Sequence, residues 1–154
     1  MKALKIIVTI LVLVFIGIQF IPVDRENPPV DKNLSFKSPE NVLKVLKKSC
    51  YDCHSYETKW PWYSYIAPAS FLVANDVKEG RKHLNFSRWN FYFPEDQDEY
   101  KEEIWEEVSS GNMPMSNYLM LHSEAELTEE DLKILKEWTQ GKESGIKFTD
   151  ENDK

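Results

Sequence analysis

Cys50-Tyr51-Asp52-Cys53-His54 is a CxxCH pentapeptide, and its spacing says more about the fold than any other stretch. Two thiols three residues apart, followed directly by an imidazole, match the attachment site of c-type haem. In such a site the thiols form thioether bonds with two vinyl groups on one edge of the porphyrin, and the histidine binds the iron. We therefore expect one covalent haem c per chain, held by Cys50, Cys53 and His54.

A CxxC pair by itself also fits a redox dithiol, half of a zinc site or a structural disulfide. A zinc site normally needs two more ligands, but these are the only two cysteines, and His83 and His122 form no HxxxH pair. A thioredoxin-like dithiol would lie within alternating strands and helices, which the sequence does not predict. Haem attachment is the favoured interpretation, and the other three stay open.

The N-terminus carries an uncharged apolar run over residues 6–23, preceded by Lys2 and Lys5. As a helix it would cover about 27 Å, close to the bilayer hydrocarbon core of about 30 Å. Lysines before the run and acidic residues after it favour a cytoplasmic N-terminus. The sequence predicts an uncleaved single-pass anchor over residues 1–23 in a bacterial inner membrane, with the remainder on the periplasmic side. A cleaved signal peptide is the alternative.

The rest of the chain divides into a linker over residues 24–37, one domain over residues 38–141 and a polar tail over residues 142–154. The formal charge is −7 for the whole chain and −9 without Lys2 and Lys5. The sequence contains no basic patch of the kind that would indicate a nucleic-acid partner. An acidic surface suits a redox partner with a positive docking face, although solubility alone also explains it.

Helical patterns surround the CxxCH motif, and no strand is convincing. Four helices are expected: from Ser38-Pro39-Glu40 to the motif, over residues 68–79 before Gly80, over residues 94–110 before Gly111, and from a capping box at Thr128 to Gly141. Residues 59–65 and 81–93 are expected to be irregular. The predicted fold is all-α: a small cytochrome c-like domain of about four short helices with long loops around a covalent haem, preceded by one transmembrane helix.

A second iron ligand is expected in the loop Gly111-Asn112-Met113-Pro114-Met115. A methionine in a loop is more easily directed at iron than one in a helical stripe, and the following proline restricts the loop backbone. Met113 is the predicted ligand, and Met115 is the alternative. Both methionines could instead pack in an ordinary core.

Aromatic and basic side chains near the motif could complete the haem site. Trp60, Trp62, Tyr63 and Tyr65 could pack on the ring or donate a hydrogen bond to a propionate. Arg81 could pair with a propionate as well. A tryptophan beside haem and a tryptophan in any core look the same in a sequence.

Two stretches resemble a known family: CYDCHSYETKWPWYSYIAPASFLVANDVKEGRKHLNFSRW, and then GNMPMSNYLMLHSEAELTEEDLKILKEW. Together with the N-terminal run they are similar to the bacterial haem-binding domain family of small, c-type-cytochrome-like proteins. The resemblance covers residues 33–139 and implies covalent haem at Cys50 and Cys53, with iron ligation by His54 and Met113. Relatives commonly have a second proline where this chain has Met115, which leaves open which methionine binds.

The expected function is that of a membrane-tethered periplasmic one-electron carrier whose iron has His and Met ligands. Its partners would be redox proteins of the respiratory chain or the periplasm. The alternatives are a haem sensor or ligand-binding module, or a peroxidase-like enzyme with an open iron position. An enzyme would need an acid–base group, for which His83 and His122 are the only histidine candidates.

Overall fold

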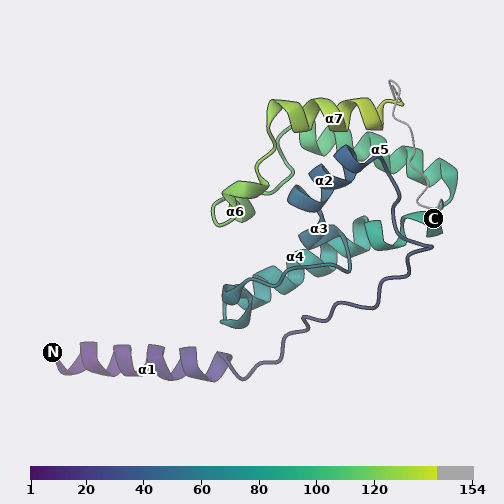
Figure 1. Cartoon of the computed structure of the whole chain (residues 1–154). Coiled ribbons are helices and arrows are strands. Elements are labelled where there is room, and N and C mark those ends of the chain that lie inside the picture. The colour runs from purple at the N-terminus through teal and green to yellow at the C-terminus, as the bar shows by residue number, and fades with distance from the viewer. Residues whose placement is uncertain (142–154) are drawn as a thin grey trace.

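The computed structural model describes residues 1–141, which form helices and loops without a β-strand. Helix α1 (Lys2–Ile18) stands apart from the other helices, and an extended segment runs from its end beside α4 to α2 (Figure 1). The remaining elements are α2 (Glu40–Ser49), α3 (Tyr51–His54), η1 (Trp62–Tyr65), α4 (Ala69–His83), η2 (Phe86–Phe91), α5 (Pro94–Ser109), α6 (Ser116–Leu119), η3 (Ser123–Ala125) and α7 (Glu129–Thr139). The all-α prediction is confirmed for the described residues.

The four expected domain helices are present as α2, α4, α5 and α7. The start of α7 is the predicted capping box, since Thr128 Oγ1 accepts from the Asp131 amide and the Asp131 carboxylate accepts from the Thr128 amide. Gly111 and Gly141 follow α5 and α7 with φ values of 77° and 65°, as expected for helix-ending glycines. The tail over residues 142–154 lies outside the described residues.

The prediction was wrong about Gly80 and about the segments between helices. Gly80 does not end α4, because the helix continues to His83. Residues 86–91, expected to be irregular, form η2, and α3, α6, η1 and η3 were not predicted. These elements are only three to six residues long, too short for a hydrophobic period to reveal them.

Helix α1 differs from the expected anchor in length. It has 17 residues and ends at Ile18, whereas the predicted segment continued to residue 23. Among the described residues, no helix combines the length and the apolar character needed to cross a membrane. The prediction of a transmembrane helix is therefore not confirmed.

The segment over residues 24–37, predicted to be a linker, makes contacts with the domain. The Arg25 guanidinium donates to the Ser64 carbonyl at 3.2 Å, and the Asn27 amide donates to the Thr58 carbonyl at 2.8 Å. The Phe36 side chain is buried in the core, and its amide donates to the Phe86 carbonyl. The segment therefore lies along the domain and closes one side of the core.

An aromatic cluster forms the centre of the core. The Phe36 ring contacts Phe86, Trp89 and Trp138, with centroid distances of 5.7, 5.0 and 5.2 Å. The Tyr51 ring stacks on Phe86 at 5.3 Å. Aromatic pairs in this distance range are favourable beyond their buried area. The cluster joins α3, η2, α7 and the segment before α2, so the residues that flank the CxxCH motif rest on a rigid base.

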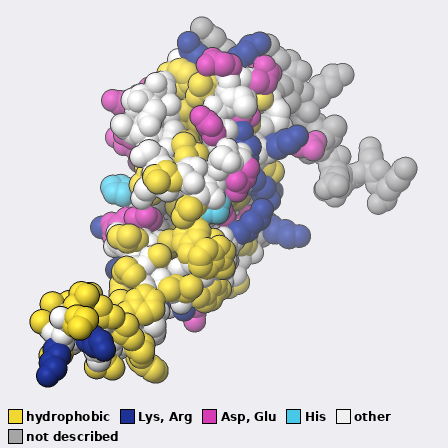
Figure 2. All heavy atoms as spheres, turned by 90° about the vertical axis from the view of Figure 1, so that its left-hand side faces the viewer, with side chains coloured by type: hydrophobic (Ala, Val, Ile, Leu, Met, Phe, Trp, Pro, Cys, Tyr) yellow, Lys and Arg dark blue, Asp and Glu magenta, His cyan; other side chains and the backbone are white. Residues whose placement is uncertain are grey.

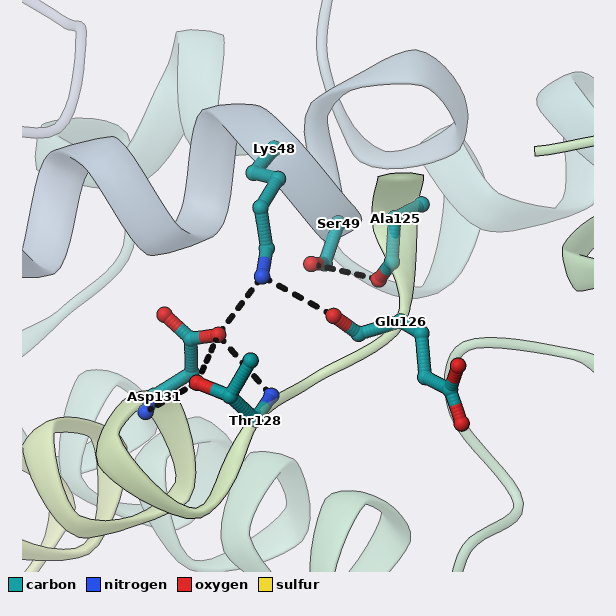
Figure 3. Close-up of polar contacts among 6 residues, drawn as sticks. All are labelled: Lys48, Ser49, Ala125, Glu126, Thr128 and Asp131. Carbon is teal, nitrogen blue, oxygen red and sulfur yellow. Dashed lines mark hydrogen bonds and ion pairs between the residues drawn. The ribbon is translucent and has the colours of Figure 1, made fainter. Parts of the chain in front are cut away.

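Polar contacts fasten the end of α2 to the start of α7 (Figure 3). The Lys48 ammonium group donates to Asp131 Oδ2 at 2.6 Å and to the Glu126 carbonyl at 2.9 Å. The Ser49 hydroxyl donates to the Ala125 carbonyl at 2.8 Å. Because Cys50 follows Ser49 directly, these bonds fix the point at which the chain enters the motif.

We expect the substitution Asp131→Asn to weaken the fold in a pH-dependent way. Burial acts to raise the pKa of Asp131, but hydrogen bonds from Lys48 and Thr128 and the Lys48 charge lower it overall. Such a carboxylate stabilises the fold above its unfolded pKa of about 3.9, and this contribution disappears as the pH falls through the folded value. The variant should lose about 1–2 kcal/mol of unfolding free energy at pH 7.

Urea unfolding at a series of pH values checks this prediction. The difference between the native chain and the variant should shrink steadily below about pH 4. Glu130→Gln, at the neighbouring exposed position, is the control and should change stability by less than about 0.5 kcal/mol. A difference that stayed constant from pH 7 to pH 2 would contradict the argument.

Candidate functional site

The CxxCH motif occupies α3 and the residue before it. Cys50 ends α2 with φ −122° and ψ −36°, so the chain turns there, and its carbonyl accepts hydrogen bonds from the amides of Cys53 and His54. This single helical turn directs both thiols and the imidazole toward one cavity. The spacing along the sequence could not by itself show that the three side chains line the same cavity.

That cavity has a volume of about 590 Å³, within the range of about 300–1,000 Å³ found for small-molecule and cofactor sites. Its walls come from α3, α4, α5 and the loop between α5 and α6. The apolar lining includes Leu84, Phe86, Ile104, Val108 and Pro114. We call this space the haem cavity below, because its donor set suits that cofactor.

His54 is held in one orientation by the backbone of Leu84, the residue that caps the C-terminal end of α4. Its Nδ1 lies 3.1 Å from the Leu84 carbonyl oxygen, which can only accept, so Nδ1 carries the hydrogen. Burial lowers the pKa of His54, although the carbonyls of Leu84 and Gly80 act in the opposite direction. The ring is therefore neutral near pH 7, and Nε2 keeps a lone pair for a metal.

The two cysteine thiols are protonated at neutral pH. Burial, reinforced by mutual repulsion with Cys53, raises the pKa of Cys50 to about 12. Burial also raises the pKa of Cys53 to about 11, with help from Asp52 and Asp76. Reactive dithiols commonly have lowered pKa values, a feature that these two thiols lack. Within residues 1–141, no group of three or more His, Cys, Asp or Glu side chains could hold a metal ion.

Met113 and Met115 both line the haem cavity. The amides of Asn112 and Met113 donate to the Glu107 carbonyl at 3.0 and 3.1 Å, which ties the loop to the last turn of α5. Met113 packs against the main core, whereas Met115 also borders a second, smaller cavity. The structure therefore brings together Cys50, Cys53, His54 and both candidate methionines.

The rim of the haem cavity is acidic. Glu103, Glu106 and Glu107 of α5 line it, together with Asp76 and Glu79 of α4. His83 is the only basic side chain of the lining besides His54, and it directly precedes Leu84, whose carbonyl accepts from His54. No lysine or arginine of the described chain lines the cavity, so propionates would have to extend to solvent or reach donors beyond the lining.

Arg81 is placed differently from the expectation that it pairs with a propionate. Its guanidinium donates to the carbonyls of Ser55 and Glu26 at 2.8 Å each, and to the side chains of Asn27 and Thr58 at 2.6 and 2.8 Å. It does not line the haem cavity. In this structure Arg81 instead clamps the loop after the motif to the N-terminal segment.

The aromatic residues after the motif also lie outside the haem cavity lining. Trp62 is 75% exposed, and Tyr65 is exposed as well. The Trp60 indole N–H is buried and has no acceptor among the described residues. Tyr63 borders the second cavity, where its hydroxyl lies 2.7 Å from His122 Nε2.

A polar network behind the motif was missed by the sequence analysis. The Tyr118 hydroxyl donates to Asp52 Oδ2 at 2.9 Å, and the Tyr118 ring stacks on His122 at 4.4 Å. His122 Nδ1 lies 3.1 Å from Glu124 Oε1. Asp52 is one of the two variable residues of CxxCH, but nothing in the sequence pairs it with a tyrosine 66 positions later.

Gly80 is the second residue whose role was missed. A Cβ atom at this position would come within 2.8 Å of the Cys53 carbonyl oxygen and 3.2 Å of its Cβ. The glycine therefore allows α4 to touch the backbone of the motif. A glycine inside an amphipathic helix is the signal that could have indicated such a close approach.

The residues present fit a covalently attached haem. Two unpaired thiols, a neutral histidine with a free Nε2, two thioethers and apolar walls surround one cavity of suitable size. A comparison with protein families agrees, since the model for the haem-binding domain matches residues 13–141. The chain belongs to the haem-binding domain family. Haem is thus the cofactor of this domain, and the predicted resemblance is confirmed.

The two other comparisons gave no relative. Neither a curated protein nor a solved structure matches the chain. The assignment of individual haem-binding residues therefore depends on the residues of this chain alone.

We expect Gly80→Ala to destabilise the haem-binding domain. Alanine favours a helix by about 1 kcal/mol over glycine, but its methyl group would meet a backbone carbonyl, and such overpacking costs about 1–3 kcal/mol. The net loss should be up to about 2 kcal/mol, with lower haem content, measured by urea unfolding and haem absorbance.

Gly17→Ala is the matched control, because a Cβ atom there has no neighbour within 4 Å. It should lower neither quantity. A Gly80→Ala protein that was more stable than the native chain would show that the contact with Cys53 is not tight.

Proposed function

We propose that the protein is a c-type haem protein that carries single electrons, with thioether bonds to Cys50 and Cys53 and iron ligands from His54 and Met113. One observation carries the proposal: both thiols, the oriented imidazole and Met113 line the same cavity. Haem iron, when bound, changes its oxidation state by one electron.

The residues of the cavity suit electron transfer, because His54 and Met113 would both be available as ligands to the iron of a bound haem. The hydrogen bond to Leu84 fixes the His54 ring, which would hold this ligand in place in both oxidation states of a bound haem. The loop with Met113 is tied to α5 by two amide hydrogen bonds. A thioether ligand raises the reduction potential, and two protein ligands leave no open position for a substrate.

Of the two histidine candidates for acid–base chemistry, one lies outside the haem cavity. His122 belongs to the second cavity, where Tyr63 and Glu124 occupy both of its ring nitrogens. His83, at the C-terminal end of α4, lines the haem cavity together with His54. The placement of His122 supports the carrier over the peroxidase-like alternative.

The acidic rim indicates the kind of protein partner. Glu103, Glu106 and Glu107 project from α5 at the cavity. A redox protein with a basic docking face would be steered toward this rim. Respiratory or periplasmic electron carriers of that charge are the proposed partners.

The proposed location is the periplasmic side of a bacterial inner membrane, with the apolar N-terminal segment as tether. All but one residue of α1 are exposed, although nearly all are apolar. Residues 19–23 extend the apolar run beyond the helix. Such a surface is unfavourable in water and favourable in lipid.

Haem attachment can be tested on protein made in a host that matures c-type cytochromes. The haem mass should remain on the chain after denaturation, because thioether bonds survive it. Met113→Ala should abolish the sulfur-to-iron absorption band of the oxidised protein, whereas Met115→Ala, the matched control, should keep it. Loss of the band only in Met115→Ala would reverse the ligand assignment, and colourless protein with two free thiols would end the proposal.

The tether is tested by extracting membranes with alkaline carbonate, which releases peripheral proteins. The native chain should stay in the membrane fraction, while Leu11→Arg combined with Val12→Arg should release it, since each arginine costs about 2.5–3.5 kcal/mol at the centre of a bilayer. Val30→Arg, in the exposed segment after α1, is the control and should change nothing. A native chain found in the soluble fraction would contradict the tether, and its intact mass would show whether the segment had been cleaved.

A further inference from the structure

One end of the domain exposes several large apolar side chains. Trp62, Ile66 and Leu72 belong to η1 and the first turns of α4 or to the residues between them, and Met120 and Leu121 follow α6. Their exposed fractions include 75% for Trp62, 67% for Leu72 and 84% for Met120. We call the surface formed by Trp62, Tyr65, Ile66, Leu72, Met120 and Leu121 the η1–α6 face.

The two halves of this face are neighbours in space. Leu72 and Leu121 line the same small cavity of about 190 Å³. Beside them, the Tyr63 hydroxyl and His122 Nε2 join η1 to the residues after α6 at 2.7 Å. In Figure 2, which looks onto this end of the molecule, apolar side chains continue from α1 to the middle of the domain.

Helix α1 leaves the domain at the η1–α6 face. Figure 1 shows the start of α4 as the part of the domain nearest to α1, with α6 on the same side of the molecule. The Gln19 side chain exchanges two hydrogen bonds with the backbone of Ala67, at 2.9 and 3.1 Å. The Arg25 guanidinium lies 4.6 Å from the Tyr65 ring centre and donates to the Ser64 carbonyl. These contacts fix the end of α1 against the face.

We infer that the η1–α6 face rests in the headgroup region of the bilayer that holds α1, an inference that depends on the tether proposed above. Tryptophan and tyrosine favour this region because their rings are apolar and their N–H and O–H groups are polar. Arg25 touches the face, and Lys59 lines its small cavity, so both can meet lipid phosphates. If α1 enters the bilayer beside this face, the exposed apolar side chains reach the lipid surface without any rearrangement of the domain.

Docking in this way would orient the haem cavity. The small cavity of the η1–α6 face shares Asp52, Cys53, Asp76, Met115 and Tyr118 with the haem cavity, so this side of the site would face the lipid. The acidic residues of α5 line the haem cavity from another element and would remain available to a protein partner in the aqueous phase. The membrane would thus select the face through which electrons are exchanged.

Nitroxide labels on the haem-loaded full chain test the inference in nanodiscs of phosphatidylcholine and phosphatidylglycerol. Leu72→Cys places a label on the face, and Phe93→Cys places one on an equally exposed residue beyond the other end of α4. The parent chain supplies the background from any native thiol. Collision rates with oxygen, which enters lipid, and with a water-soluble nickel chelate are then compared.

We expect the label at position 72 to collide several-fold more with oxygen than with the nickel chelate, and the label at position 93 to show the reverse. If both labels favour the nickel chelate while the chain resists carbonate extraction, the docking inference is wrong and the tether stands. If the label at position 72 is shielded from both reagents, and more strongly at higher protein concentration, a second copy of the chain covers the face. The docking inference is wrong in that case as well. Release by carbonate would instead contradict the tether itself.

Discussion

The backbone contact between α3 and α4, at Cys53 and Gly80, is the constraint on which the site depends. Because Gly80 has no side chain, α4 can approach the motif closely enough for Leu84, one turn later, to accept the His54 Nδ1–H. The same approach gives Arg81 its bond to the Ser55 carbonyl. One missing methyl group thereby sets the tautomer of the proposed iron ligand and closes the loop that follows the motif.

Around this contact, polar side chains hold the loops against other parts of the domain. Arg81 links the N-terminal segment to the loop after His54, and Lys48 links α2 to α7. Tyr118 reaches from α6 to Asp52 inside the motif, and burial, together with the Asp52 charge and hydrogen bond, raises the pKa of this tyrosine. The shortest helices bury little apolar surface each, so such ties and the aromatic cluster add to the packing of α2, α4, α5 and α7.

The long helices were predictable because each has a periodic apolar face and an end signal. Thr128 and Asp131 show this most clearly, since a capping box needs only residues three positions apart. Gly80 shows the opposite case: the rule that glycine ends helices failed because this glycine is needed for a contact with another element. Arg81 likewise has four bonds to groups at least 23 positions away, which no local pattern contains.

The sequence by itself determined the chemistry that is available: CxxCH provides two thiols and an imidazole within five residues, and the G-x-M-P loop provides a thioether. These are local features, so their spacing along the chain is enough to identify them. Only the tertiary structure decided which groups meet, because it folds residues 50–54, 76–86, 100–108 and 113–118 around one cavity. It also excluded Arg81, Trp60 and Trp62 from the lining, since contacts between distant segments depend on the packing of the whole domain and not on any single stretch.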